Sequence, residues 1–180
     1  MIDNDRTIIT LPDWRIKIIE EKVVELFKEL NINQLPYDVF DIAVSKGYRI
    51  DGNINNYVDI PLFERQDGIS CRNIKKEYSI IYDGNTMKQR IRFTIMHEIG
   101  HIVLGHRHSS QLAEKEANYF AAYALAPKPL IKKYNINNES VLSKFFDVSY
   151  SCSEVILSNI NNEKGTELNS HEKWILENLK

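Results

Sequence analysis

A short run of residues near the middle of the chain carries the clearest chemistry. His97-Glu98-Ile99-Gly100-His101 is an HExxH pattern. Residues four apart on a helix lie on one face, so both imidazoles can reach a single ion. Glu98 lies about 100° round the helix from His97, close enough to hold a water molecule without binding the metal itself. Two neutral imidazoles suit Zn²⁺, one ion per chain, and one protein ligand is then still missing.

The rest of that segment is apolar. Between Phe93 and His106, Glu98 is the only charged residue. The far side of the helix is filled by Ile91, Ile95, Ile99, Ile102 and Val103. Such a pattern predicts a central, buried helix, where a carboxylate is costly unless it has a partner. The alternative is a pair of core histidines with a Glu98 salt bridge. Because it leaves three ionisable groups crowded on one arc, we favour a metal site.

The missing ligand must come from another segment. A third histidine in an HExxHxxGxxH arrangement would require glycine at 104 and histidine at 107, where this chain has Leu104 and Arg107. The next predicted helix offers Glu114 and Glu116. Glu114 falls inside its apolar arc and Glu116 outside it, so we expect Glu114 to face the core and Glu116 to face water. Asn118, one turn after Glu114, is either a hydrogen-bond partner of a ligand or an ordinary surface residue.

Two sequence blocks stand out between Gln89 and Pro127. They read Arg-Phe-Thr-Ile-Met-His-Glu-Ile-Gly-His at 92–101 and Glu-Lys-Glu-Ala-Asn-Tyr-Phe-Ala-Ala at 114–122. Together they resemble the ImmA/IrrE family of zinc metallopeptidases. The resemblance implies that His97, His101 and Glu114 bind zinc in a gluzincin-like site and that Glu98 is the general base. The usual second block ends Leu-Leu-Met-Pro, whereas this one ends Ala-Leu-Ala-Pro at 124–127, a difference that concerns packing rather than ligands.

The resemblance also implies a function. Members of that family commonly cleave a helix-turn-helix repressor, so the expected activity is a zinc-dependent endopeptidase acting on a repressor or antitoxin-like regulator. Two other functions stay open: a catalytically silent metal-binding interaction module, and a DNA-binding regulator that uses the C-terminal helices. The helix expected over 150–161 contains no Lys or Arg. Since phosphate contacts require basic residues, we do not expect direct nucleic-acid binding.

Hydrolysis at such a site needs a donor for the developing oxyanion and a place for the substrate. Candidate donors are the tyrosines and histidines outside the metal pair: Tyr119, Tyr123, His106, His108 and His171. The residues alone do not choose among them. The strand expected over 78–82 directly precedes the HExxH helix, and an extended substrate could pair with its edge.

The elements that position these residues follow from the periodicity of apolar side chains. We expect Asp13 to cap the first helix, Pro36 to open the second and Gly47 to end it. Helices are predicted over 14–30, 36–47, 86–104, 111–126, 129–134, 139–146, 150–161 and 170–178, and strands over 48–50, 68–71 and 78–82. The predicted fold is α+β, with helices around a small, mostly antiparallel sheet and a zincin-like core in which the HExxH helix packs on a second ligand-bearing helix. We expect a metallopeptidase domain at 1–135 and a helical extension at 136–180 packed on the same core.

Composition limits the remaining classes of protein. The 180 residues include 43% hydrophobic and 27% charged residues with a net charge of −2, as in an ordinary globular protein. The N-terminus lacks the order of a signal peptide, and we expect neither a membrane-spanning segment nor a membrane partner. Two cysteines, Cys71 and Cys152, cannot form a disulfide framework. We therefore expect a reduced, cytoplasmic protein.

Overall fold

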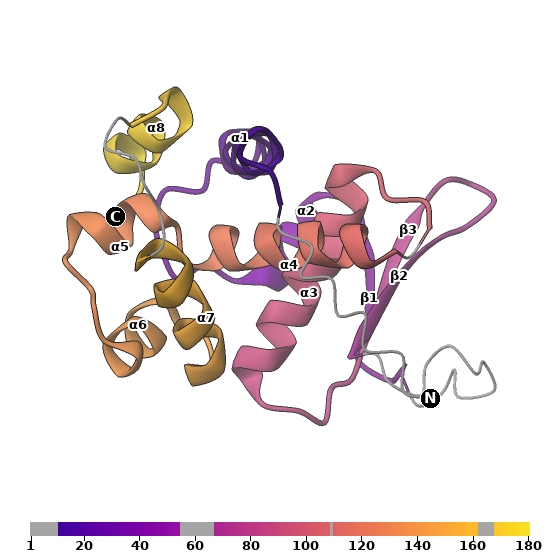
Figure 1. Cartoon of the computed structure of the whole chain (residues 1–180). Helices are drawn as coiled ribbons and strands as arrows, with labels where there is room; N and C mark the ends of the chain where they lie inside the picture. The colour runs from indigo at the N-terminus through magenta and orange to yellow at the C-terminus, as the bar shows by residue number, and fades with distance from the viewer. Residues whose placement is uncertain (1–10, 55–66, 109, 162–167) are drawn as a thin grey trace, which may run out of the picture.

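The computed structural model describes residues 11–54, 67–108, 110–161 and 168–180. Its elements are α1 (Asp13–Glu29), α2 (Val39–Ser45), β1 (Arg49–Asp51), β2 (Gly68–Arg72), β3 (Tyr78–Tyr82), α3 (Lys88–Leu104), α4 (Gln111–Leu125), α5 (Lys128–Lys133), α6 (Glu139–Phe146), α7 (Tyr150–Asn161) and α8 (Ser170–Asn178). The predicted α+β class is confirmed. In Figure 1 the sheet lies at one end, α3 and α4 cross the middle, and α5 to α8 gather at the other end.

The sheet has the strand order β1-β3-β2 within the described residues. β1 runs parallel to β3 over three residue pairs, and β2 runs antiparallel to β3 over five. The longer pairing is therefore antiparallel, as expected. The hypothesis that a substrate pairs with the 78–82 strand is wrong, because β3 is the central strand and its backbone groups on both sides are already paired. In the part of the chain that the structure describes, β2 is the edge strand beside α3.

The two long central helices pack closely on each other. α3 ends at Gly105, whose φ of 72° is a left-handed conformation that glycine adopts without strain. α4 begins after Ser110, whose side chain accepts a hydrogen bond from the Ala113 N–H. Gly100 of α3 lies against the fully buried ring of Phe120 of α4. This close approach brings side chains of the two helices into one site.

The first two helices begin differently from the prediction. Pro12 occupies the cap position of α1, and Asp13 lies inside the first turn, where its charge complements the positive end of the helix dipole. α2 begins three residues after Pro36, because Asp38 is its cap and accepts a hydrogen bond from the Phe40 N–H. Gly47 follows the end of α2 with a φ of 72°, as expected.

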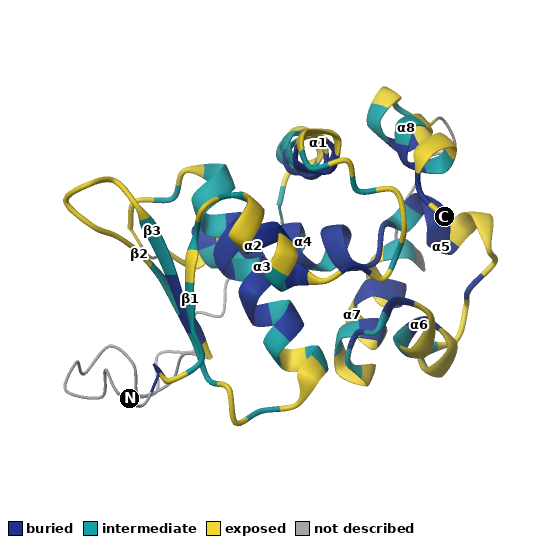
Figure 2. Ribbon diagram, turned by 180° about the vertical axis from the view of Figure 1, so that it is seen from behind, coloured by how far each residue is buried: buried dark blue, intermediate teal, exposed yellow. Residues whose placement is uncertain are grey.

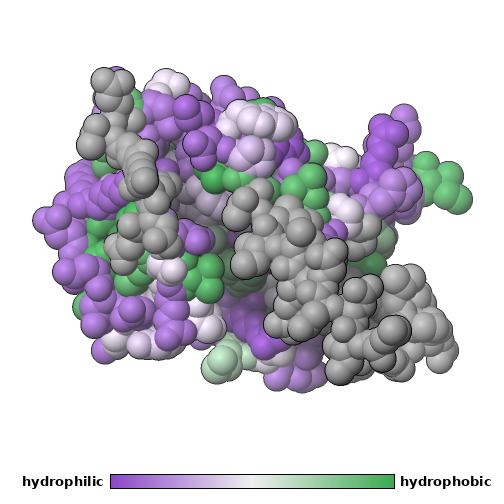
Figure 3. Space-filling model, viewed as in Figure 1, coloured by the Kyte–Doolittle hydropathy of each residue, from purple (hydrophilic) through white to green (hydrophobic). Residues whose placement is uncertain are grey.

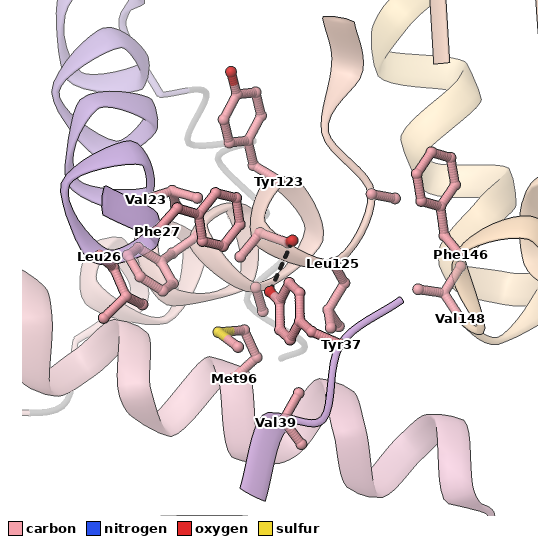
Figure 4. Close-up of a cluster of buried hydrophobic side chains, with 14 of the residues drawn as sticks. Val23, Leu26, Phe27, Tyr37, Val39, Met96, Tyr123, Leu125, Phe146 and Val148 are labelled. Atoms are coloured by element: carbon pink, nitrogen blue, oxygen red, sulfur yellow. Dashed lines mark hydrogen bonds between the residues drawn. The ribbon is translucent and has the colours of Figure 1, made fainter. Parts of the chain in front are cut away.

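One continuous hydrophobic core joins the elements. Figure 2 shows the buried residues on the facing sides of the helices, with exposed residues on their outer faces. Figure 4 shows Phe27 of α1, Met96 of α3 and Leu125 of α4 converging, with the Tyr37 hydroxyl donating to the Ala124 carbonyl oxygen over 2.8 Å. The core also includes Phe146 and other residues beyond 135. The boundary that we predicted at 135/136 stays a prediction.

The face of the molecule seen in Figure 1 carries many polar side chains. In Figure 3 hydrophilic residues cover much of the face seen in Figure 1, and hydrophobic residues lie in separate patches. Among the described residues, no helix combines the length and the apolar character needed to cross a membrane.

Candidate active site

Three side chains from the two central helices converge on one point. His97 and His101 come from α3 and Glu114 from α4, and one ligand atom of each lies within 4.8 Å of the others. The two Nε2 atoms are 3.0 Å apart, and the Glu114 oxygens lie 3.3 Å from Nε2 of His97 and 3.5 Å from Nε2 of His101. Ligands held at about 2.0–2.1 Å around a tetrahedral zinc ion lie about 3.3 Å from one another. The three residues therefore fit a metal ion of this kind.

The electrostatics favour the neutral imidazoles that metal binding requires. Burial lowers the pKa of His97 and outweighs the opposing effect of Glu114. Burial, together with the charge of the neighbouring His97, lowers the pKa of His101 to about 4. Both rings are therefore neutral near pH 7, and each leaves one nitrogen lone pair available to a cation.

Asn118 orients the first of these rings. Its Oδ1 lies 2.9 Å from Nδ1 of His97. An amide oxygen can only accept, so His97 carries its proton on Nδ1 and presents the lone pair of Nε2 to the site. Of the two interpretations of Asn118, the structure supports contact with a ligand, although Asn118 itself is exposed.

Glu98 lies beside the cluster and faces β2. It is 5% exposed. Burial raises its pKa to about 7, a shift that hydrogen bonds from the hydroxyl and the backbone N–H of Ser70 partly oppose. Gly68 of the same strand allows this contact, because a Cβ there would collide with the methyl group of Thr94 on α3. Ser70 and Gly68 were not among the predicted site residues, since no local motif marks them.

Glu116 corrects one sequence prediction. It is buried, with a side chain only 5% exposed, whereas the Glu114 side chain is 40% exposed at the wall of the site. The prediction that Glu116 faces water is wrong because Arg15 compensates its charge and His106 adds a hydrogen bond. Arg15 of α1 donates to both carboxylate oxygens over 2.6 and 2.5 Å, and His106 lies 2.8 Å away. The hydrogen bonds and charge of Arg15, with a further hydrogen bond from His106, hold the pKa of Glu116 below its usual value despite burial.

The cluster opens into a pocket of about 380 Å³. One wall is the start of β2, one is α3, and the others are the turn after α3 and the first half of α4. The pocket is lined by Asp67, Gly68, Ile69, Ser70, Phe93, Thr94, His97, Glu98, His101, His106, Arg107, His108, Glu114 and Asn118.

The structure reduces the set of candidate oxyanion donors. His106 and His108 line the pocket. Tyr119 donates to Glu20, and His171 lies 2.9 Å from the same carboxylate, so both belong to a separate buried network between α1, α4 and α8. Tyr123 is part of the hydrophobic core, as Figure 4 shows. These three residues are therefore not oxyanion donors.

Comparison with known proteins agrees with this geometry. A search of curated proteins found no match. The family model of the IrrE N-terminal-like domain, Peptidase_M78, matches residues 57–158, more than half of the chain. The matched segment contains α3, α4 and every residue of the convergent cluster. The chain therefore belongs to the Peptidase_M78 family of metallopeptidases, and the resemblance to ImmA/IrrE proteins is confirmed.

Proposed function

We propose that this protein is a zinc-dependent endopeptidase, with His97, His101 and Glu114 as the zinc ligands and Glu98 as the catalytic residue. The observation that carries the proposal is the convergence of three ligand atoms at the edge of an open pocket, with a buried carboxyl group beside them. Two nitrogens and one oxygen leave one position of a tetrahedral ion for water, which is the arrangement of catalytic rather than structural zinc sites.

In the bound state, zinc would polarise the substrate carbonyl and lower the pKa of a water molecule toward about 7. Glu98 takes a proton from the attacking water as the water oxygen bonds to the carbonyl carbon. It later delivers that proton to the nitrogen of the leaving amine as the peptide C–N bond breaks. A pKa of about 7 suits a group that must both accept and return a proton near neutral pH. Ser70 holds the Glu98 carboxyl group in place through its N–H and hydroxyl.

The proposed path of the substrate follows β2. Gly68, Ile69 and Ser70 line the pocket, and β2 is one of the two edge strands of the sheet among the described residues. An extended peptide could therefore add to this edge through main-chain hydrogen bonds and pass its scissile carbonyl in front of Glu98. His108 lies across the pocket as the remaining candidate oxyanion donor, because both ring nitrogens of His106 already contact His101 and Glu116.

A helix-turn-helix repressor or antitoxin-like regulator is the proposed substrate. This part of the proposal is supported by the family resemblance, because members commonly cleave such proteins. The test is to incubate the purified, zinc-loaded protein with the product of the neighbouring gene, with and without a chelator. We expect cleavage that the chelator abolishes and that added zinc restores.

The Glu98→Ala variant separates catalysis from metal binding. Loss of a general base typically costs about 10²–10⁴-fold in rate, so we expect this variant to keep its zinc and lose cleavage. Glu154→Ala, which removes an exposed carboxylate on α7, is the matched control and should cleave normally. Full activity of Glu98→Ala would refute its role as the base. A zinc-loaded wild-type protein that cleaves no peptide or protein would favour a metal-binding interaction module instead.

A further inference from the structure

A line of polar contacts leads from the second metal-ligand histidine away from the pocket to α1. Nδ1 of His101 lies 2.9 Å from Nδ1 of His106, and Nε2 of His106 lies 2.8 Å from Glu116. Arg15 holds the far side of that carboxylate through two hydrogen bonds. We propose that His106, held by Glu116 and Arg15, is a positioning residue that fixes which nitrogen of His101 faces the metal. The inference rests on the proposed zinc site.

The chemistry of the donors and acceptors gives this line a direction. The Arg15 guanidinium can only donate, and the ionised Glu116 carboxylate can only accept. Nε2 of His106 therefore carries the ring proton and donates to Glu116, which leaves a lone pair on its Nδ1. That lone pair accepts the Nδ1–H of His101, and Nε2 of His101 is left unprotonated toward His97 and Glu114. Asn118 imposes the same tautomer on His97.

The local fold holds His106 in this place. After α3 the chain reverses direction at Gly105, in its left-handed conformation, and the His106 N–H donates to the carbonyl oxygen of His101 over 3.0 Å. The rings of His101 and His106 have an interplanar angle of 73°, so they contact each other edge-on and are not stacked. The side chain of His106 is 11% exposed and that of Glu116 is 5% exposed. Water therefore has little access to compete for these bonds.

Three substitutions of His106 distinguish the effect of its hydrogen bond to His101 from the effect of its side-chain volume. In His106→Asn the side-chain oxygen takes the place of Nδ1 and can still accept from His101. In His106→Gln the amide group takes the place of Nε2, and the acceptor for His101 is lost although the side chain is larger. His106→Ala lacks both groups. His108→Ala, in the same turn and also lining the pocket but exposed, is the matched control.

The readout is zinc affinity, measured by competition with a chromophoric chelator, together with the visible absorption of the Co²⁺-loaded protein, which reports ligand geometry. Loss of a group that orients a ligand typically costs about 10–100-fold in metal affinity. We expect a loss of that size for His106→Ala and His106→Gln, with an altered Co²⁺ spectrum. His106→Asn should recover most of the affinity and the wild-type spectrum, and His108→Ala should match the wild type.

The outcomes separate this inference from the proposed function. If His106→Ala binds zinc as tightly as the wild type, or if His106→Gln binds it better than His106→Asn, the positioning role is refuted while the peptidase proposal stands. If the wild type and the variants show the expected order of zinc affinities but the wild type cleaves nothing, the positioning role stands and the peptidase proposal fails. Circular dichroism confirms that each variant is folded before its affinity is measured.

Discussion

Adding one methyl group at Gly100 tests whether close packing of α3 on α4 sets the geometry of the proposed metal site. A Cβ at this position would lie 3.0 Å from Cδ1 and 3.2 Å from Cβ and Cγ of Phe120. These distances are shorter than ordinary van der Waals contacts, and the Phe120 ring is fully buried. The Gly100→Ala variant therefore forces α4 and α3 apart by a few tenths of an ångström.

Two effects of opposite sign decide the change in stability. Alanine in place of glycine inside a helix gains about 0.5–1 kcal/mol, and overpacking a core typically costs about 1–3 kcal/mol. The expected net loss in unfolding free energy is thus about 0–2.5 kcal/mol. Glu114 lies on the displaced helix, so bringing it back to the two histidines requires part of this strain to be overcome when zinc binds. A cost of about one or two kcal/mol corresponds to a factor of about 5–30 in zinc affinity.

Urea denaturation of the metal-free protein gives the first quantity, and chelator competition gives the second. The double variant Gly100→Ala/Phe120→Leu removes ring atoms that the new methyl group would meet. We therefore expect a favourable coupling between the two substitutions and partial recovery of zinc affinity. The reasoning is refuted if Gly100→Ala is more stable than the wild type by the full helix-propensity gain and binds zinc equally well.

Three further predictions concern the metal and the buried charges. Zinc at about 100 times its Kd should raise the free energy of unfolding by about 2.7 kcal/mol, measured by denaturation with and without the ion. Glu114→Ala should lower zinc affinity more than Glu116→Ala, since it removes a proposed ligand rather than a supporting group; the reverse order would contradict the assigned roles. Burial alone would raise the pKa of Glu20, but His171, Lys128 and Tyr119 outweigh it and hold the pKa below the ordinary 4.5. The ionised Glu20 therefore stabilises the fold above pH 4.5, and this stabilisation is lost as the pH falls through the lowered pKa. The free energy of unfolding of Glu20→Gln should therefore fall less than that of the wild type between pH 6 and pH 3.

Periodicity and motif spacing predicted most of the fold. The α+β class and the bounds of β3, α6, α7 and α8 agree with the prediction, because each of these segments has a strong apolar pattern between clear breaks. The predicted beginning of α2 was wrong, because a single side-chain cap at Asp38 sets where the helix begins. The role of β3 as the central strand depends on pairing with β1, about 30 residues away in the chain, which no local pattern reveals.

The candidate site was predicted unevenly for a related reason. His97, His101 and Glu114 follow from helix periodicity and the family motif, and the structure brings them together. The burial of Glu116 could not be predicted from its own helix, since the charge that compensates it comes from Arg15 of α1, 101 residues away in sequence. A helical wheel shows only the residues of one helix. It therefore predicts that an acidic residue faces solvent even when a basic residue of another element compensates its charge and allows burial.

The pairing of Arg15 with Glu116 also bears on how small a working version of this protein can be. The segment that matches the family model begins at residue 57, and α1 lies wholly outside it. A fragment trimmed to 57–158 would retain all three ligands but would leave Glu116 buried without its counter-ion and would uncover the core side chains that pack on Phe27. The smallest fragment that keeps the packing around the candidate site therefore includes α1, and domain boundaries taken from sequence similarity alone would cut it away.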